Sequence, residues 1–443
     1  MASLFGLARR NWLVFNPSEA PKSTGPLRFG ILGAAYIAPI ALILAAKTHP
    51  DVVVQAVAAR DPKKAKTFAQ KHGIQEVSSN YQGNCMIFDF VYYTTLRTNT
   101  NHYYASALED LLDNPNIDCV YIPLPNGLHF EWALRALKAG KHVLLEKPSV
   151  DNVTEAEALF KNPILNSPKA PILLEAAHYA FHPAWTTFMS YVSPTDVSSA
   201  KAVLWVPKWK FAADDIRYQY DLGGGALMDL GTYTASALTR VFGSVAEECE
   251  ECLTQAASYD SRCDQLFKAR YKFPGGRRGE MEGDLKAPLD RMSPNIYVEH
   301  IPIVVSSADV GIQVPKDQEV VRIRKVKFSN FVMPTIFHSI QIDDKFLTRK
   351  IGDKSGTAIK KWTKSKTIKA YTFKEVDIDQ PGEPSWTTYR YQLEGFVNKV
   401  RGREARQWVS GIDSINTTKM LDMAYVAAKL PLRPTSKLVD SSI

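Results

Sequence analysis

The strongest constraint on this fold is a repeated order of apolar runs and helical stretches in the first third of the chain. Apolar runs rich in β-branched residues lie at Leu27–Leu32, Val52–Ala59, Asp118–Pro123 and His142–Leu145. Helical stretches separate them, such as His129–Ala139, whose apolar residues recur at helical spacing. Strands that alternate with helices predict a parallel sheet with helices on both faces.

The pattern changes after about residue 150. Strand-like runs follow at 202–206, 269–273, 301–306, 320–328 and 337–342, and helical segments near 226–242 and 388–400. Several of the strands have no helical crossover between them, which favours antiparallel pairing. We therefore expect an α/β protein with an N-terminal arm (1–26), a parallel-sheet domain (27–149) and a second α/β domain (150–443) with a large, mostly antiparallel open sheet.

Composition argues against several classes of protein. The formal net charge of +8 is moderate and its basic residues are spread along the chain, so we expect no nucleic-acid partner. No apolar run approaches the roughly twenty residues that span a bilayer, so no membrane partner is expected. Cys249 and Cys252 have a metal-like spacing, but no second pair completes a four-ligand zinc site, and we expect no metal. Free thiols suit a reducing compartment, which favours a cytoplasmic location.

The first 26 residues lack the long apolar core of a secretory signal. A mitochondrial presequence would need an extended amphipathic helix, against which Glu19 and the prolines at 17, 21 and 26 argue. We expect an arm that packs on the surface or stays mobile.

The turn after the first strand is the first chemical signal. Gly33 supplies a tight turn, and Ala35 and Ala38 stand where a dinucleotide-binding GxGxxG motif has its later glycines. Alanine is small enough for close approach, and Tyr36 and Ile37 complete the turn. This predicts a Rossmann-type pyrophosphate site, with a strand-to-helix turn that serves packing alone as the alternative.

The end of the second strand is the second signal. NAD-dependent enzymes tend to place an acidic residue there to bind the ribose hydroxyls. Here the strand ends in Arg60, and Lys63 and Lys64 follow. A guanidinium at this point can pair with a 2′-phosphate, so we expect NADP. Asp61 could reach the ribose, and a solvated basic face remains the alternative.

The third signal is Glu146-Lys147-Pro148, at the end of a buried strand. Open parallel sheets bind ligands in the crevice outside the carboxyl ends of their strands. A lysine there can donate to a substrate oxygen and stabilise charge while a hydride moves. The alternative is an ordinary surface lysine in a turn.

The fourth signal follows the glycines at 223, 224 and 225, which open a helix where the backbone must bend or approach a ligand. Asp229 and Tyr233 are four residues apart and share one helical face. A tyrosine aimed at a substrate hydroxyl can exchange its proton if nearby positive charge, such as that of Lys147, lowers its pKa. The alternative is a helix start with Tyr233 in the core.

Together these signals resemble the Gfo/Idh/MocA oxidoreductases, and within them the dimeric dihydrodiol dehydrogenases and fungal NADP-dependent D-xylose dehydrogenases. The resemblance covers nearly everything from Leu27 to Pro434. The residues that carry it are Phe29–Ala35, Ala56–Asp61, Tyr121–His129, Gly140–Pro148, Leu174–Ala176, Tyr179, Phe181–Pro183 and Asp229–Tyr233.

The resemblance implies residue roles. Lys147 and Tyr233 would be the catalytic pair, with Asp229 as a further active-site residue. The cofactor would be NADP, held by Gly33, Ala35, Tyr36, Ile37, Arg60, Lys64, Leu124, Asn126, His129, Glu146 and Lys147. His182 and Tyr179 would lie toward the substrate, and a homodimer is implied.

Two departures from the family pattern stand out. Residues 83–103 have no counterpart in the family and form either a surface insertion or a gene-model error. Ala180 stands where relatives commonly have arginine, so activity is expected to be weakened or redirected if that arginine shapes the substrate site.

The resemblance thus implies hydride transfer from CH–OH groups of a small sugar or diol. The expected substrate is an aldose such as D-xylose, oxidised to its lactone, or a trans-dihydrodiol. Two alternatives stay open. One is a relative that uses the cofactor non-consumptively in glycoside cleavage. The other is an NADP-binding sensor or partner protein without turnover.

Overall fold

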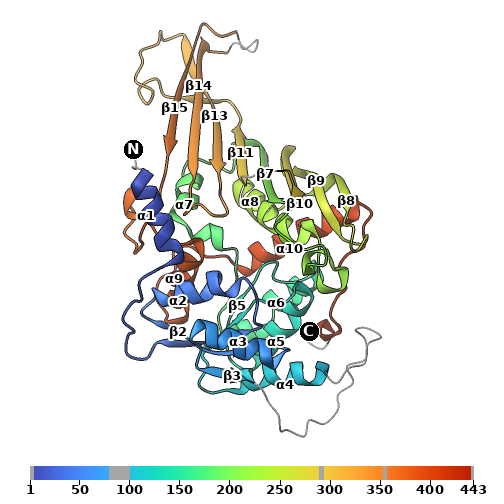
Figure 1. Ribbon diagram of the computed structural model, residues 1–443. Coiled ribbons are helices and arrows are strands. Elements are labelled where there is room, and N and C mark those ends of the chain that lie inside the picture. Colours follow the sequence, from blue (N-terminus) through green and yellow to red (C-terminus); the bar gives the residue numbers. More distant parts are fainter. Residues whose placement is uncertain (1–3, 79–99, 289–293, 353–356, 441–443) are drawn as a thin grey trace. The chain divides into compact units, whose positions relative to one another are not determined.

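The computed structural model describes residues 4–78, 100–288, 294–352 and 357–440 (Figure 1). The chain divides into two compact units, each treated by itself below. The first comprises Met1–Ala176, Tyr389–Gly411 and Thr435–Ile443, and the second comprises Ala177–Thr388 and Ile412–Pro434. The first unit thus extends past the expected boundary at residue 149, because a strand at Leu173–Glu175 still pairs within its sheet.

The first unit contains a parallel sheet of six strands. They are β1 (Leu27–Leu32), β2 (Val52–Ala58), β3 (Glu76–Ser78), β4 (Cys119–Ile122), β5 (His142–Leu145) and β6 (Leu173–Glu175). Their spatial order is β3-β2-β1-β4-β5-β6, and every neighbouring pair is parallel. This is the strand order of a dinucleotide-binding Rossmann sheet, and it confirms the predicted parallel architecture.

Helices accompany these strands. They are α1 (Leu4–Phe15), α2 (Leu44–Lys47), α3 (Pro62–His72), α4 (Thr100–Asp113), α5 (His129–Lys138), α6 (Val153–Phe160) and α9 (Thr388–Val400). Helices α2 to α6 connect the strands, whereas α1 precedes β1 and α9 follows the last strand of the second unit. Crossovers run outward from β1 in both directions, and right-handed crossovers that reverse direction place their helices on opposite faces of a sheet. The strands are correspondingly buried, with Phe29 and Ile31 fully inside.

The N-terminal arm contains a helix that the sequence analysis did not predict. α1 ends at Phe15, before Pro17, so the prolines at 17, 21 and 26 lie beyond it and do not oppose it. After the helix, the amide of Ala20 donates to the carbonyl of Lys47 and that of Ser23 to the carbonyl of Pro50. The arm therefore packs on the first unit, as one of the two expectations had it.

The second unit is built on a nine-stranded sheet. Its strands are β7 (Val197–Pro207), β8 (Glu248–Ala256), β9 (Asp264–Phe273), β10 (Arg277–Ala287), β11 (Asn295–His300), β12 (Ile303–Val305), β13 (Gln318–Ser329), β14 (Ser339–Lys350) and β15 (Lys360–Ile368). The order is β15-β14-β13-β11-β7-β10-β9-β8, with β12 beside β13. Only the β7–β10 pair is parallel among the described pairs, which confirms a mostly antiparallel sheet.

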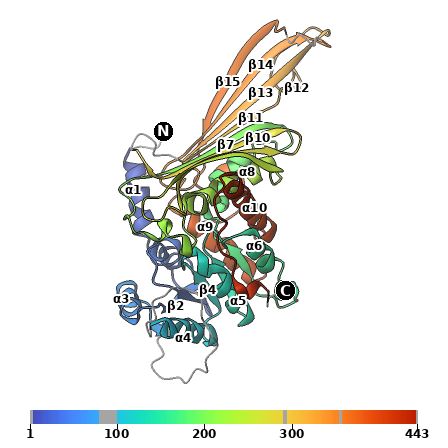
Figure 2. The same cartoon turned by 90° about the vertical axis from the view of Figure 1, so that its right-hand side faces the viewer.

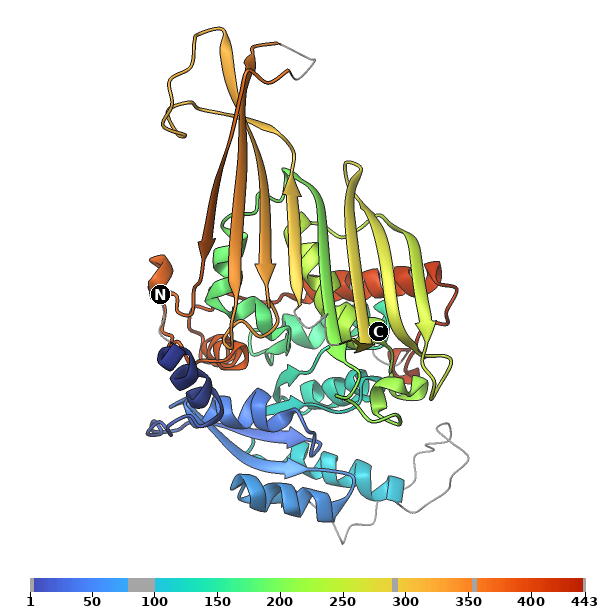
Figure 3. The same ribbon diagram turned by 45° about the horizontal axis from the view of Figure 1, so that its top comes forward.

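Helices cover one face of this sheet. They are α7 (Pro183–Met189), α8 (Thr232–Phe242) and α10 (Gly411–Ala427), and α8 and α10 lie on the same side of the strands (Figures 2 and 3). Along β9, the side chains of Ala269, Tyr271 and Phe273 are buried. The residues that alternate with them, Lys268, Arg270 and Lys272, are exposed. The period of two shows that the opposite face is open within this unit.

A buried ion pair lies in the core of the second unit. The side chains of Asp264 and Arg433 have no exposed surface, and Nη2 of Arg433 lies 3.4 Å from Oδ1 of Asp264. The hydroxyl of Tyr425 donates to Oδ1 of Asp264 at 3.0 Å, and the amide of Leu227 donates to Oδ2 at 2.6 Å. Burial raises the pKa of Asp264, although Arg433 opposes the shift. The carboxylate therefore depends on its partners to stay ionised.

Replacing Arg433 by Met should lower the free energy of unfolding at pH 7 by about 3–5 kcal/mol, because it leaves a buried carboxylate without its cation. In the variant, the folded-state pKa of Asp264 would lie further above its unfolded value. As the pH falls, the folded variant therefore takes up a proton before the unfolded chain does, which stabilises it. The loss of unfolding free energy relative to the wild type should thus shrink from pH 7 to pH 4.5. Urea unfolding at both pH values measures this, with Arg433→Lys as control. An equal deficit at both pH values would contradict it.

Candidate functional site

The turn after β1 is shaped by a glycine. Gly33 has φ +112°, a backbone conformation that disfavours L side chains, and its amide donates to the carbonyl of Ala58 at the end of β2. A Cβ at Gly33 would lie 3.0 Å from Cδ2 of Leu124, in the loop after β4. The loops after β1 and β4 thus approach each other closely at the carboxyl edge of the sheet. Any other residue at this point would be strained.

The residues beyond Gly33 form a tight turn into a helix. The amide of Ala35 donates to the carbonyl of Gly33 at 2.9 Å, and a π-helical turn (Pro39–Ile43) leads into α2. Tyr36 is 85% exposed and Ile37 is half-buried, whereas Ala38 is fully buried. Ala38 therefore serves helix packing, and the turn from Ala35 to Ile37 is the part that faces outward.

The end of β2 presents exposed cations. Arg60 and Lys64 are both exposed, on the turn and in the first turn of α3. Asp61 caps this helix, because its Oδ1 accepts from the amides of Lys63 at 2.8 Å and Lys64 at 3.3 Å. The carboxylate of Asp61 is thus engaged by the helix, and the exposed cations are accessible to an anion.

A buried histidine ties two loops of this edge together. Nε2 of His129 lies 2.7 Å from the carbonyl oxygen of Leu124, and Nδ1 lies 2.7 Å from that of Pro148. The ring is 1% exposed, and burial lowers the pKa of His129 to about 4. His129 therefore positions the loops after β4 and β5 from inside the unit. Within the loop after β4, Asn126 is half-buried and begins a short 3₁₀ turn.

Glu146 and Lys147 come directly after β5. The amide of Glu146 still donates to the carbonyl of Ile122, so the strand pairing continues to this point. The hydroxyl of Tyr121 donates to Oε1 of Glu146 at 2.6 Å, and the amide of Lys147 donates to Oε2 at 3.3 Å. The buried carboxylate thereby fixes the backbone that carries the half-buried Lys147.

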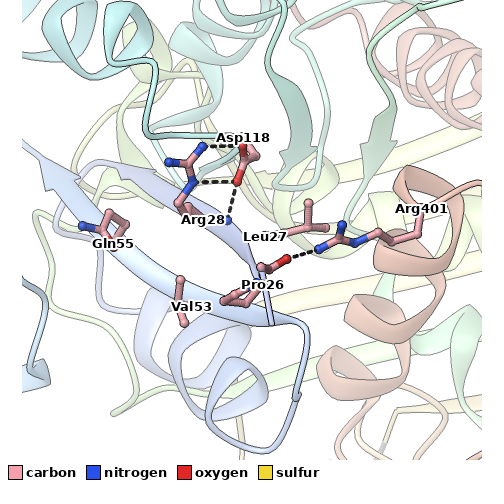
Figure 4. A pocket seen from close by; sticks show the side chains of 8 residues that line it. Pro26, Leu27, Arg28, Val53, Gln55, Asp118 and Arg401 are labelled. Carbon is pink, nitrogen blue, oxygen red and sulfur yellow. Dashed lines mark hydrogen bonds and ion pairs between the residues drawn. The ribbon is translucent and has the colours of Figure 1, made fainter. Parts of the chain in front are cut away.

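An open hollow of about 510 Å³ lies at the other edge of this sheet. It is lined by residues at the amino ends of β1 and β2 and by Asp118, just before β4 (Figure 4). Arg28 is engaged there by Asp118, with Nη2–Oδ1 2.8 Å, and Arg401 donates to the carbonyl of Gly25. Nucleotides bind at the carboxyl edge of such sheets, so we do not assign this hollow to the cofactor.

In the second unit, Tyr233 belongs to a chain of buried polar groups. Its hydroxyl lies 2.9 Å from Nε2 of His178, and Nδ1 of His178 lies 2.8 Å from Oγ1 of Thr388. The exposed fractions of Tyr233, His178 and Thr388 are 8%, 1% and 1%. The sequence did not point to His178, although it is adjacent to Tyr179. No local pattern connects it to Tyr233, which lies 55 positions away.

Asp229 lies in a π-helical turn (Leu227–Gly231) that precedes α8. Its Oδ2 accepts from Nε of Arg217 at 2.9 Å, and Arg217 also contacts Asp215. The guanidinium stacks over the ring of Phe211 at 4.0 Å. Asp229 thus sits half-buried one helical turn before Tyr233, and π-turns of this kind are frequent at functional sites.

The glycines before α8 make room for protein groups. A Cβ at Gly224 would lie 2.8 Å from the amide nitrogen of Gln219, and one at Gly225 would lie 2.8 Å from the hydroxyl of Tyr425. The carbonyl of Gly224 accepts from Nε of Arg433 at 2.9 Å. These glycines let the buried Asp264–Arg433 pair anchor the helix that carries Tyr233. The close approach expected from the sequence is therefore to the protein's own core.

Tyr179 and His182, the expected substrate contacts, lie in the interior of the second unit. Tyr179 has no exposed surface and donates to Oγ of Ser236 at 2.9 Å. His182 is also fully buried and caps α7, accepting from the amide of Ala184 at 3.1 Å. Ala180 is 5% exposed between them. Within this unit both side chains contact protein groups, and their contact with substrate stays a prediction.

The expected insertion at 83–103 falls mainly outside the described residues. Residues 83–99 belong to the part that is not described, and 100–103 form the start of α4.

The first unit matches a known protein family. A family model described as an oxidoreductase family with an NAD-binding Rossmann fold matches residues 27–162. The curated D-xylose 1-dehydrogenase (NADP(+)) 2 of Haloferax volcanii is 31% identical over 264 residues, which cover 59% of this chain and 70% of that protein. The trans-1,2-dihydrobenzene-1,2-diol dehydrogenase of Xenopus tropicalis is 27% identical over 269 residues, and this alignment covers 59% of this chain and 70% of that protein.

Other relatives match over shorter stretches or in fold alone. Curated dTDP-3,4-didehydro-2,6-dideoxy-α-D-glucose 3-reductases are 31–34% identical, and the alignments span 55–61% of their length. A solved levoglucosan dehydrogenase in complex with NADH and levoglucosan superposes with a TM-score of 0.63 at 17% identity. It covers 91% of this chain and 97% of that protein. These findings confirm the fold and the family resemblance.

The buried His129 predicts acid sensitivity. Because burial lowers its folded-state pKa to about 4 from 6.5, the folded state binds fewer protons, and stability should be lost as the pH falls from about 6.5 through 4. The full effect is roughly 3 kcal/mol. His129→Gln should lose less stability than the wild type between pH 7 and pH 4.5 in urea unfolding. His72→Gln, in α3, is the control: burial also lowers the pKa of this histidine, but it is only half-buried, so H72Q should change the slope less than H129Q. Identical slopes for H129Q and wild type would refute the assignment.

Proposed function

This chain belongs to the Gfo/Idh/MocA family of oxidoreductases, and from that premise we propose that it is an NADP-dependent dehydrogenase of a small sugar or diol. The proposed substrate is an aldose such as D-xylose, oxidised at its anomeric carbon to the lactone, or a trans-dihydrodiol. The names of the xylose and dihydrodiol dehydrogenase relatives support this class of substrate.

The residues of the first unit fit a nicotinamide dinucleotide. The turn at Gly33 brings the backbone within van der Waals contact of Leu124, at the carboxyl edge where such sheets receive a pyrophosphate. Arg60 and Lys64 are exposed cations at the end of β2, suited to a 2′-phosphate, and Asp61 is engaged as a helix cap. We therefore propose NADP over NAD. Bound NADP would supply the carbon that accepts a hydride from the substrate.

The other proposed cofactor contacts come from the turn after β1 and from the loops after β4 and β5. Ala35, Tyr36 and Ile37 would contact the pyrophosphate, whereas Leu124 and Asn126 would follow the nicotinamide ribose. His129 would act indirectly, because its ring packs against a carbonyl of each loop and donates a hydrogen bond to one of them. Glu146 would likewise act by fixing the backbone of Lys147.

The observation that carries the catalytic proposal is the buried chain from Tyr233 through His178 to Thr388. We propose that the phenol of Tyr233 and the ammonium of Lys147 handle the proton of the substrate hydroxyl. The imidazole fixes the phenol through one hydrogen bond and offers its proton a path to a second hydroxyl. His178 is thus a positioning residue, and Asp229, held by Arg217, would orient the substrate.

Replacing Lys147 by Met should abolish turnover while most of the NADP affinity is kept, because the change removes the charge that stabilises a developing alkoxide and leaves the other cofactor contacts intact. His178→Asn should lower kcat by up to about 100-fold with little change in KM, since it releases the phenol. NADPH formation is measured across pentoses, hexoses and dihydrodiols as a function of pH. Wild-type turnover without net NADPH would favour non-consumptive glycoside cleavage, and retained turnover in K147M would remove Lys147 from the mechanism.

Arg60→Ala should weaken NADP binding by about 10- to 100-fold and leave NAD binding unchanged, because only NADP carries the 2′-phosphate that the guanidinium would pair with. Fluorescence titration with both dinucleotides measures the two dissociation constants. Lys63→Ala, an exposed lysine in the same helical turn, is the matched control. Equal weakening for NADP and NAD would count against Arg60 as the selecting residue.

A further inference from the structure

The excess positive charge of the chain lies on three neighbouring strands. β13, β14 and β15 together hold eleven Lys or Arg and three Asp or Glu, a net +8 that equals the formal net charge of all 443 residues. The basic residues themselves are spread along the chain, as expected from the sequence, but their excess over acidic residues is concentrated on these strands. Antiparallel pairing lines these strands up side by side at one edge of the sheet (Figure 2).

Few of these charges are neutralised within the described residues. Carboxylates pair with Arg324, Arg349 and Lys325. The lysines of the edge strand β15 are all exposed, and their hydrogen bonds go to neutral oxygens: Lys364 donates to the carbonyl of Val310 and Lys366 to the hydroxyl of Tyr191. Asp309 and Asp317, in the loop before β13, offset only part of this charge.

Two exposed aliphatic side chains flank the connection between β14 and β15. Ile351 is 61% exposed and follows Lys350, and Ile359 is 53% exposed and precedes Lys360. Their backbones are fixed, because the amide of Ile351 donates to the backbone carbonyl of Asp317 and the amide of Ile359 donates to that of Thr348. Lysines on an edge strand commonly prevent aggregation, but exposed isoleucines work against that purpose. The combination points to a partner that is both anionic and apolar.

This end of the sheet has a small core of its own. Val310, Val320 and Phe346 are buried together, and Trp362 stacks on Phe346 with ring centroids 5.3 Å apart. The strands therefore present the isoleucines and lysines on a packed support. The tryptophan is engaged by two side chains, because Nζ of Lys360 also lies 5.8 Å from its ring centroid. Single-stranded bases stack on open aromatic faces, so this ring is poorly suited to bind them.

We propose that this basic hairpin end, defined as Lys350, Ile351, Ile359, Lys360 and Lys361, docks on an anionic phospholipid surface. The isoleucines enter the boundary between headgroups and acyl chains, and the lysines contact the anionic headgroups. No helix in the described part of the chain is long and apolar enough to cross a membrane, and surface docking needs none. A second copy of the chain would bring like charge to this end, which disfavours self-association there.

The test is co-sedimentation of the full chain with vesicles of 70% phosphatidylcholine and 30% phosphatidylserine, compared with pure phosphatidylcholine. Binding is expected to the anionic vesicles alone and to weaken strongly between 50 and 500 mM salt. The double variant K360E/K361E should reduce the partition coefficient by at least about tenfold, since each lysine contributes about fivefold. The variant I351S/I359S should reduce it several-fold at both salt concentrations.

The matched control is K268E/K419E, which makes the same charge change at exposed lysines of the same unit outside β13–β15. Its binding should fall less than twofold, and circular dichroism melting should show all variants folded. Equal losses in the two charge variants, or equal binding to neutral vesicles, would overturn the proposal. A third result would also overturn it: the chain does not bind vesicles, but it binds oligo(dT) in a salt-sensitive way that K360E/K361E abolishes. Neither result bears on NADP binding, so the proposed function is tested separately.

Discussion

Parallel pairing of β1, β4 and β5 is the constraint on which the first unit depends. Because the carboxyl ends of parallel strands meet at one edge, the glycine turn, the loop after β4 and Lys147 are brought together there. His129 then fixes the distance between two of these loops by contacting one carbonyl in each. A buried ring at this point limits how far either loop can shift without leaving a buried polar group unpaired.

The second unit uses a buried charge for a similar purpose. Asp264 and Arg433 lie against the glycines at 224 and 225, and the amide of Leu227 binds the carboxylate. The start of the helical segment is thereby held in the core, and Tyr233 follows in its second turn. His178 reaches the phenol from a different segment, so two independent anchors define where the hydroxyl lies.

The sequence predicted more about local geometry than about side-chain partners. The tight turn at Gly33 follows from a backbone rule that acts over a few residues. The interior positions of Tyr179 and His182 do not follow in this way, because motif membership does not say which way a side chain points. The helix α1 was missed for a related reason: prolines that lie beyond a helix say nothing about the residues before it.

By itself the sequence determined the alternation of strands and helices, the change to antiparallel pairing and the family, because each is encoded in short patterns of apolar, small and polar residues. Tertiary structure alone decided which distant groups meet. Asp264 and Arg433 are 169 residues apart, and only folding can desolvate them together. It also decided where charge accumulates, since lysines that are unremarkable along three strands become one surface when hydrogen bonds set the strands side by side.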